Sequence, residues 1–184
     1  GQPDKINLFK YMTPIAHISS GYIIYIAATQ LIKIENTPLL IIAIIGSLIP
    51  DVDAFFGLNM KDHHNTIFHT PLFWLIIFNI LFILGQSILL EYMDLIYIFF
   101  LGVFIHLLSD WITARTAGIR VFYPFKKNNY SLFKLESDKG NIPIFPNKNN
   151  FKVWMKFWTH YLKNKYLLAF EIIITITPIF MTII

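Results

Sequence analysis

The stretch MDLIYIFFLGVFIHLLSDWIT, residues 93–113, combines a long apolar run with two titratable side chains near its end. It is long enough for a helix that crosses a bilayer, which needs about 20 apolar residues. His106 and Asp110 are at positions i and i+4, so on a helix both side chains lie on one face. Ionisable groups inside a membrane are costly and usually functional. The stretch therefore predicts a membrane helix with a polar site at one end, and a purely structural His–Asp hydrogen bond is the alternative.

The composition of the whole chain also indicates a membrane protein. Of its 184 residues, 55% are hydrophobic and 14% are charged, and the mean hydropathy is +0.56. A soluble domain carries roughly a quarter charged residues. The length suits one domain, so we expect residues 1–184 to form a single membrane domain. Because the chain has no cysteine, any metal ion must be bound by histidine, aspartate or glutamate.

Four further apolar segments flank this stretch, at residues 15–32, 38–49, 71–90 and 166–184. The segment 38–49 is short for a full span, and Pro71 suits the first position of a helix. The predicted fold is all-α, a polytopic membrane bundle of four to five spans with a polar metal-site cluster at one membrane face. Its parts are an N-terminal segment (1–14), a four-helix core (15–113), a cytoplasmic loop (114–150), an interfacial amphipathic helix (151–165) and a C-terminal span (166–184).

The predicted helix over residues 151–165 carries aromatic residues and lysines at helical spacing. This pattern is typical of a helix that lies in the membrane interface, and it fits equally well a helix that packs on the protein itself. His160 lies in this segment and is interpreted as an interfacial residue. Glu171 lies inside the last apolar segment, and the sequence assigns it no role.

Following the segments across a bilayer brings the polar residues to one face. Alternate spans return the chain to its starting side, so every histidine except His160 falls there, together with Asp51, Asp53 and Asp110. Fourteen of the fifteen lysines and arginines fall on the same side, and Lys33 is the exception. The positive-inside rule makes this side cytoplasmic. We therefore expect an integral membrane protein whose site faces the cytoplasm.

These polar residues form a plausible ligand set for metal ions. Neutral imidazole and carboxylate are favoured by zinc, iron and manganese. Without a metal, the cluster would carry several unpaired charges in a low-dielectric site. We expect two or three divalent ions, with zinc first and manganese or iron as alternatives. The predicted metal ligands are His17, Asp51, Asp53, His64, His69, His106 and Asp110.

Five motifs occur in order along the chain: AHISSGY (16–22), GSLIPDVDAFF (46–56), HHNTIFHTPLF (63–73), HLLSDWIT (106–113) and GIRVFYPF (118–125). Together they resemble the YdjM-type family of membrane-bound metal-dependent hydrolases of the bacterial inner membrane. That family is distantly similar to zinc-dependent phospholipase C and to single-strand nucleases of the same helical fold. The resemblance covers roughly residues 16–125 and implies the same seven ligands. Where the family has Arg-Gly, this chain has Asn65-Thr66, and Arg115 or Arg120 is a candidate substitute for the missing arginine.

The first functional hypothesis is hydrolysis of a phosphoester in a lipid or lipid-linked substrate by metal-activated water. Asp53, Asp110 and His69 are the predicted catalytic residues. Membrane lipids are the expected partners, and no nucleic acid is expected. The alternatives are a transporter or proton or ion relay, and a non-catalytic membrane protein with a structural metal site. The candidates for binding the substrate phosphate are Arg115, Arg120 and Lys126. The sequence leaves open the substrate, the oligomeric state and the role of His63.

Overall fold

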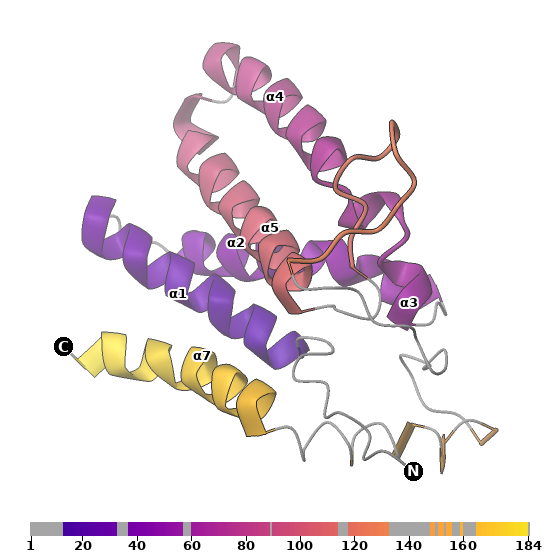
Figure 1. The fold of residues 1–184 in the computed structure, drawn as a ribbon. Helices are drawn as coiled ribbons and strands as arrows, with labels where there is room; N and C mark the ends of the chain where they lie inside the picture. The colour runs from indigo at the N-terminus through magenta and orange to yellow at the C-terminus, as the bar shows by residue number, and fades with distance from the viewer. Residues whose placement is uncertain are drawn as a thin grey trace.

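The computed structural model describes residues 13–32, 37–56, 60–88, 90–113, 118–132 and 165–183, with short pieces at 148–149, 151–152, 154–155 and 159. Within these residues the regular secondary structure is helical, apart from one isolated antiparallel bridge between Ile119 and Tyr130 (Figure 1). This confirms the all-α fold class. Arg115 and His160 lie outside the described residues, as does most of the helix predicted over 151–165.

The five predicted apolar segments all form long helices. Short helical turns connect several of them. In particular, α2 continues directly into the 3-10 helix η1 (Ile49–Phe56), and two short elements, α3 (Met60–His63) and η2 (Ile67–His69), precede α4. The turn η3 (Leu90–Tyr92) leads into α5. The long helices are α1 (Pro14–Ile32), α2 (Thr37–Leu48), α4 (Pro71–Ser87), α5 (Met93–Thr113) and α7 (Lys165–Ile183).

Helix α2 lies between α1 and α5 and approaches both closely. A Cβ atom added at Gly102 of α5 would lie 2.8 Å from the backbone nitrogen of Ser47. One added at Gly46 of α2 would lie 2.2 Å from the carbonyl oxygen of Phe99. Small residues that let helix backbones meet are typical of helix packing in membranes. This contact fixes the C-terminal end of α2 against the part of α5 that carries His106.

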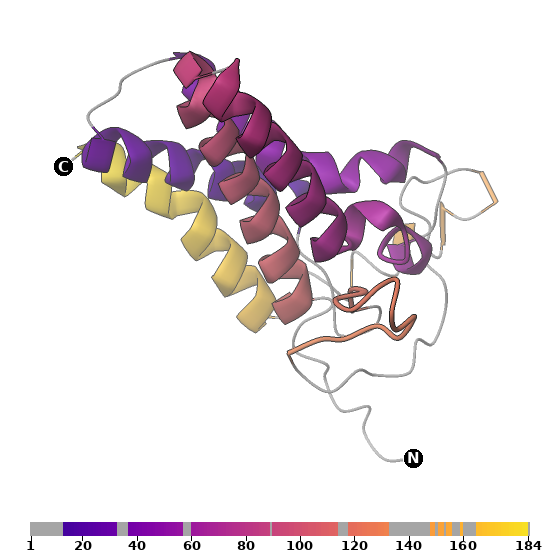
Figure 2. The same cartoon turned by 90° about the horizontal axis from the view of Figure 1, so that it is seen from above.

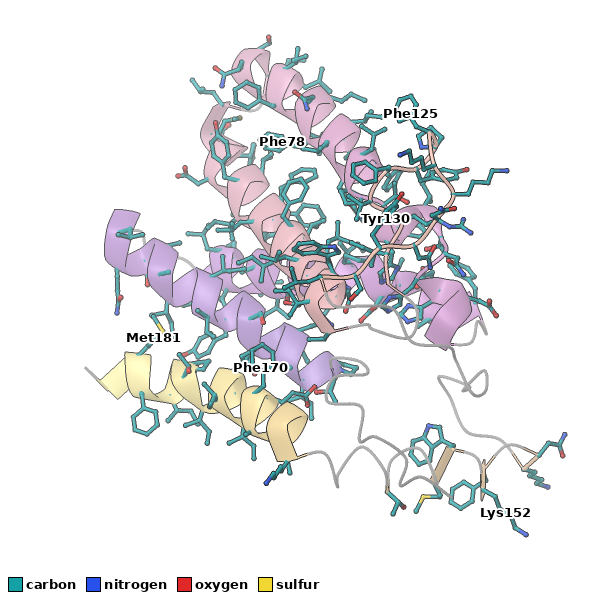
Figure 3. All side chains as sticks on the ribbon, in the orientation of Figure 1. Phe78, Phe125, Tyr130, Lys152, Phe170 and Met181 are labelled. Atoms are coloured by element: carbon teal, nitrogen blue, oxygen red, sulfur yellow. The ribbon has the colours of Figure 1, made fainter. Side chains whose placement is uncertain are left out.

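The remaining helices pack on the outside of this group: α4 against α5, and α7 against α1 (Figures 1 and 2). Aromatic side chains fill the space between α4 and α5, where Phe78 lies (Figure 3). The centre of this cluster is Trp74, Phe100, Val103 and Leu107. Ile119 joins it, so the segment after α5 is held against the end of the helix pair.

Two helical stretches, Thr37–Ala54 and Leu90–Thr113, are long and apolar enough to cross a membrane. The first is longer than the segment 38–49 predicted from the sequence, because α2 continues into η1. Shorter apolar helices occur at Pro71–Ser87 and Leu168–Met181. Large apolar side chains such as Ile83 of α4 and Ile173 of α7 are 66% and 63% exposed. Such uncovered apolar faces are compatible with lipid contact, and the count of four to five spans remains a prediction.

Candidate metal centre

The seven predicted ligand residues come together at one end of the molecule, as the predicted topology required. His17 is in the first turn of α1, and Asp51 and Asp53 lie on η1 directly after α2. His106 and Asp110 are in the last two turns of α5. The connection from η1 to α4 supplies His64 and, in η2, His69. All seven are buried except Asp51, whose side chain is 25% exposed.

A first donor group consists of Asp51, His69, His106 and Asp110, each offering one atom within 4.8 Å of the others. His106 Nε2 lies 3.1 Å from Asp110 Oδ2 and 3.4 Å from Asp51 Oδ1. His69 Nε2 lies 3.4 Å from Asp51 Oδ1 and 3.5 Å from Asp110 Oδ2. A tetrahedral zinc ion with bonds of about 2.0–2.1 Å spaces its ligand atoms about 3.3 Å apart. These four distances are close to that spacing, so the four side chains could hold one ion.

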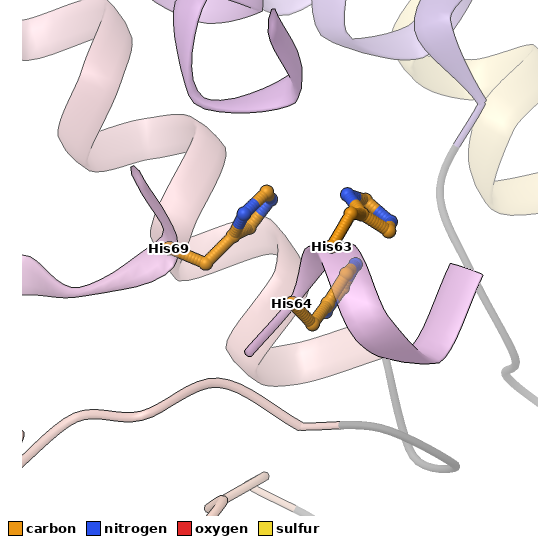
Figure 4. Close-up of side chains that lie close together, drawn as sticks. All are labelled: His63, His64 and His69. Atoms are coloured by element: carbon orange, nitrogen blue, oxygen red, sulfur yellow. The ribbon is translucent and has the colours of Figure 1, made fainter. Parts of the chain in front are cut away.

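A second donor group consists of His63, His64 and His69, whose rings gather in one place (Figure 4). The rings of His64 and His69 are stacked, with centroids 4.7 Å apart. Asp53 lies beside this group: its two carboxylate oxygens are each 3.4 Å from a ring nitrogen, Nδ1 of His63 and Nδ1 of His69. His69 belongs to both donor groups. Its Nε2 faces Asp51 and Asp110, and its Nδ1 faces Asp53.

Two histidines are oriented by backbone carbonyl groups. His106 donates from Nδ1 to the carbonyl oxygen of Ser47 at 2.7 Å, and His64 donates from Nδ1 to that of Gly118 at 3.1 Å. A carbonyl oxygen only accepts hydrogen bonds, so in both rings Nδ1 carries a hydrogen, and Nε2 faces Oδ2 of Asp110, at 3.1 Å for His106 and 3.9 Å for His64. Metal-binding histidines are commonly held in this way. Gly118 has a φ of 63°, a left-handed conformation that suits glycine.

Several buried atoms of the cluster lack a hydrogen-bond partner among the described residues. They include both ring nitrogens of His69, Nε2 of His106, Oδ1 of Asp53 and Oδ2 of Asp110. Buried polar atoms in proteins are normally satisfied, and exceptions call for an explanation such as a bound ion. Carboxylate oxygens and imidazole nitrogens are the donor types that zinc, manganese and iron use. The residues present therefore fit a divalent metal centre.

The two loop histidines have opposite pKa shifts. Burial and the neighbouring His63 lower the pKa of His64 well below its usual value, so its ring is neutral. Burial alone would also lower the pKa of His69, but the nearby negative charges of Asp110, Asp51 and Asp53 raise it well above its usual value. The surroundings of His69 thus favour a positive charge, which a proton or a metal ion can supply.

Three residues predicted to take part in the site lie outside the two donor groups. His17 stacks on His106 with centroids 3.9 Å apart, and its Nε2 is 3.7 Å from Oδ1 of Asp110. It belongs to neither donor group, so its role as a ligand stays a prediction. Arg120 donates from Nη1 to the carbonyl oxygen of Asn65, next to His64, at 2.7 Å. Lys126 is exposed.

His63, whose role was left open in the sequence analysis, lies in the second donor group. Its Nδ1 lies within 3.7 Å of a carboxylate oxygen of both Asp51 and Asp53. The single helical turn α3 ends at His63, and the chain then turns, so that His63 and His64 both face the cluster. Their rings meet edge to face, at 83°. No local pattern distinguishes such a turn in the sequence, although the two adjacent histidines were a hint.

Glu171 of α7, which the sequence left unassigned, has a structural partner. Its carboxylate accepts hydrogen bonds from the backbone nitrogen and the hydroxyl of Thr13, at 2.8 Å and 3.0 Å. Thr13 precedes α1, and its carbonyl oxygen accepts from the backbone nitrogen of His17. A carboxylate at a helix N-terminus is also favoured by the helix dipole. Glu171 therefore ties α7 to the end of α1 that carries His17.

The fold and the cluster define a class: an all-helical protein with apolar helices and a buried His/Asp centre that could hold metal ions. A family model described as YdjM inner membrane protein matches residues 12–183, which is most of the chain. The chain belongs to this family. Comparisons with curated proteins and with solved structures found no match.

Proposed function

We propose that the protein is a membrane-embedded, metal-dependent hydrolase that cleaves a phosphoester of a lipid or lipid-linked substrate at the cytoplasmic face of the bacterial inner membrane. The observation that carries this proposal is the pair of buried donor groups that share His69. Paired metal sites recur in enzymes that hydrolyse phosphoesters. Two divalent ions, with zinc as our first choice, would supply the positive charge that polarises a phosphoryl oxygen and makes a water molecule more acidic.

Each group of residues has a defined task in this proposal. Asp51, His69, His106 and Asp110 would hold one ion, and His63, His64 and His69 the other. Asp53 lies between His63 and His69, and the hydroxyl of Thr66 donates to its Oδ2. Its other oxygen, Oδ1, is buried without a hydrogen-bond partner in the described part of the chain. In this proposal, Asp53 accepts the proton of an attacking water molecule.

Arg120 is the best-supported candidate for binding the substrate phosphate. It bonds to Asn65, at the position where the resemblance noted above implies an arginine. One nitrogen of its guanidinium group, Nη1, is used in this bond, whereas Nε is buried without a partner among the described residues. A guanidinium group has five donors and commonly binds phosphate through two of them. Arg120 therefore has donors left for an anion beside His64.

The distribution of polar groups favours this function over an ion pathway. On α5, His106, Ser109 and Asp110 lie in the last two turns, whereas the preceding residues 95–105 are apolar or aromatic. A transport pathway needs polar groups throughout the depth of the membrane. The cluster instead resembles a site at one membrane surface, next to apolar helix faces that lipid can contact.

The first test is the metal content of detergent-purified protein, measured by mass spectrometry. We expect about two equivalents of a divalent transition metal, and the double variant His106→Ala/Asp110→Ala, which removes two of the four ligands of the first donor group, should lose the ion held there. The matched control is Asp94→Ala, which removes an exposed carboxylate at the other end of α5 and should keep the metal. The same three proteins are then tested on chromogenic phosphomonoesters and phosphodiesters and on phospholipids. Protein that lacks metal after reconstitution with zinc, manganese and iron would overturn the proposal.

A further inference from the structure

The segment 118–132, here called the rim loop, lies over the edge of the metal centre and is fixed there at its base. Gly118 accepts the hydrogen bond from His64, and Arg120 donates to the carbonyl oxygen of Asn65. Asn129 donates to the side-chain oxygen of Asn65 at 2.7 Å. Farther along, the backbone nitrogen of Leu132 donates to Trp111 of α5 at 2.8 Å. Both arms of the loop are therefore anchored beside the site.

The tip of the rim loop, residues 122–127, is apolar and basic. Phe122 is 52% exposed and Phe125 is 85% exposed, and Phe125 points away from the helices (Figure 3). Lys126 and Lys127 follow directly and are exposed. The rim loop contains no aspartate or glutamate. Exposing a whole phenylalanine ring to water is unfavourable, by about 25 cal/mol per Å² of apolar surface. The tip therefore combines apolar rings that are unfavourably exposed to water with a positive charge.

The position of the loop places this tip near the level of a membrane surface. The rim loop begins at Gly118, shortly after Thr113, which ends the helical stretch that is long enough to cross a membrane. Ile119 packs against Trp74 in the first turns of α4. Aromatic rings and lysines at the ends of membrane helices commonly lie among lipid headgroups. Anionic headgroups attract basic residues near the surface.

We propose that the tip of the rim loop inserts into the headgroup region of an anionic bilayer, with Phe122 and Phe125 among the upper acyl chains and Lys126 and Lys127 bound to lipid phosphates. Lys126 then contacts bulk lipid and not the substrate in the centre. Gly118 and Arg120, at the base of the loop, keep their hydrogen bonds to His64 and Asn65. Insertion of the tip therefore holds the edge of the metal centre at the depth of the headgroups. This inference rests on the membrane location alone, so it stands or fails independently of hydrolysis.

The test uses the full-length protein reconstituted in vesicles. Since the chain has no cysteine, Phe125→Cys gives a single labelling site for an environment-sensitive fluorophore. The matched control is Asn128→Cys, an exposed polar position just beyond the lysines in the same loop. Vesicles contain either phosphatidylcholine alone or phosphatidylcholine with phosphatidylglycerol, and a nitroxide on the lipid at a shallow or deeper position quenches the fluorophore. Lys126→Glu/Lys127→Glu is combined with the label at position 125.

We expect blue-shifted emission at position 125 and stronger quenching there than at position 128. The inserted fraction should be greater in anionic vesicles and should fall with added salt. Each lysine near an anionic surface favours insertion by about fivefold, so the double charge reversal should largely abolish quenching. An unshifted, unquenched label in anionic vesicles would overturn the proposal. A blue shift without quenching would also overturn it, because another protein surface would then cover the tip. Equal quenching in both vesicle types would overturn the role given to the lysines.

Discussion

At the scale of single residues, His69 is the side chain that the two donor groups share. Its Nε2 faces Asp51 and Asp110, and its Nδ1 faces Asp53. The ring is fully buried, at 0% exposure, and neither nitrogen has a hydrogen-bond partner among the described residues. Isolated buried polar atoms are costly. The ring of His69 thus has carboxylates beside both nitrogens, and a cation between ring and carboxylate would balance their charge.

The first prediction compares His69→Ala with His63→Ala. His69 belongs to both donor groups and His63 to one. The His69 variant should lose both ions, whereas the His63 variant should keep about one equivalent, since four ligands of the first group remain. Mass spectrometry of metal per chain measures the difference. Equal losses in the two variants would contradict the assignment of separate groups.

The second prediction concerns Asp53→Asn. Asp53 lies outside both donor groups and close to His63 and His69. If it accepts a proton from water, its amide variant should keep the metal and lose turnover by roughly 10²- to 10⁴-fold. Turnover and metal content are measured on the same preparation, with Asp94→Asn as the control. A matching loss of metal would instead make Asp53 a ligand.

At the scale of elements, the close contact between α2 and α5 sets the geometry of the centre. Ser47 lies in the contact formed by Gly46 and Gly102, and its carbonyl oxygen orients His106. Asp51 follows four residues later, on η1. A shift of one helix would move the carboxylate of Asp51 and the hydrogen bond of His106 together. The packing of the two helices is thereby coupled to the geometry of the His/Asp cluster.

The third prediction is that Gly102→Val weakens both stability and metal binding. A Cβ atom at this position would lie 2.8 Å from the backbone nitrogen of Ser47, so the helices must separate. Overpacking of this kind costs typically about 1–3 kcal/mol. The measurements are thermal unfolding in detergent and a zinc titration. The control is Leu101→Val, a change to the neighbouring, 47% exposed side chain, which should alter neither. Unchanged zinc affinity in the glycine variant would argue against the coupling.

The helices were predicted well from the sequence, because a long apolar segment is compatible with few structures other than a helix. The bounds predicted for the fourth segment, 93–113, are those of α5, and Pro71 begins α4 as expected. The continuation of α2 into η1 was not predictable, because Pro50 indicates a helix end and the 3-10 turn after it depends on packing. The same limit applies to His63, whose direction is set by a short turn. The clustering of His17, His64, His69 and His106 followed from the predicted topology.

At the scale of the whole molecule, the His/Asp cluster joins elements that are far apart in the sequence. It brings together α1, η1, the η2 connection and the end of α5. Asp51, Asp53 and Asp110 are gathered within reach of the same histidines, and His69 lies within 3.5 Å of a carboxylate oxygen of all three. Gathering like charges in a poorly solvated place is unfavourable unless positive charge balances them. Bound cations should therefore stabilise the entire helical assembly.

The fourth prediction is a large loss of thermal stability when the metal is removed. A ligand present at about 1,000 times its dissociation constant stabilises the folded state by roughly 4 kcal/mol, which corresponds to about 8–16 °C for a chain of this size. Chelation of the detergent-purified protein should lower the unfolding temperature by this order, and zinc should restore it. In His106→Ala/Asp110→Ala, which lacks two ligands of the first donor group, chelator should lower the unfolding temperature less than in the wild-type protein. A wild-type protein that is equally stable with and without chelator, although metal analysis shows complete removal, would mean that the histidines and carboxylates satisfy one another without an ion.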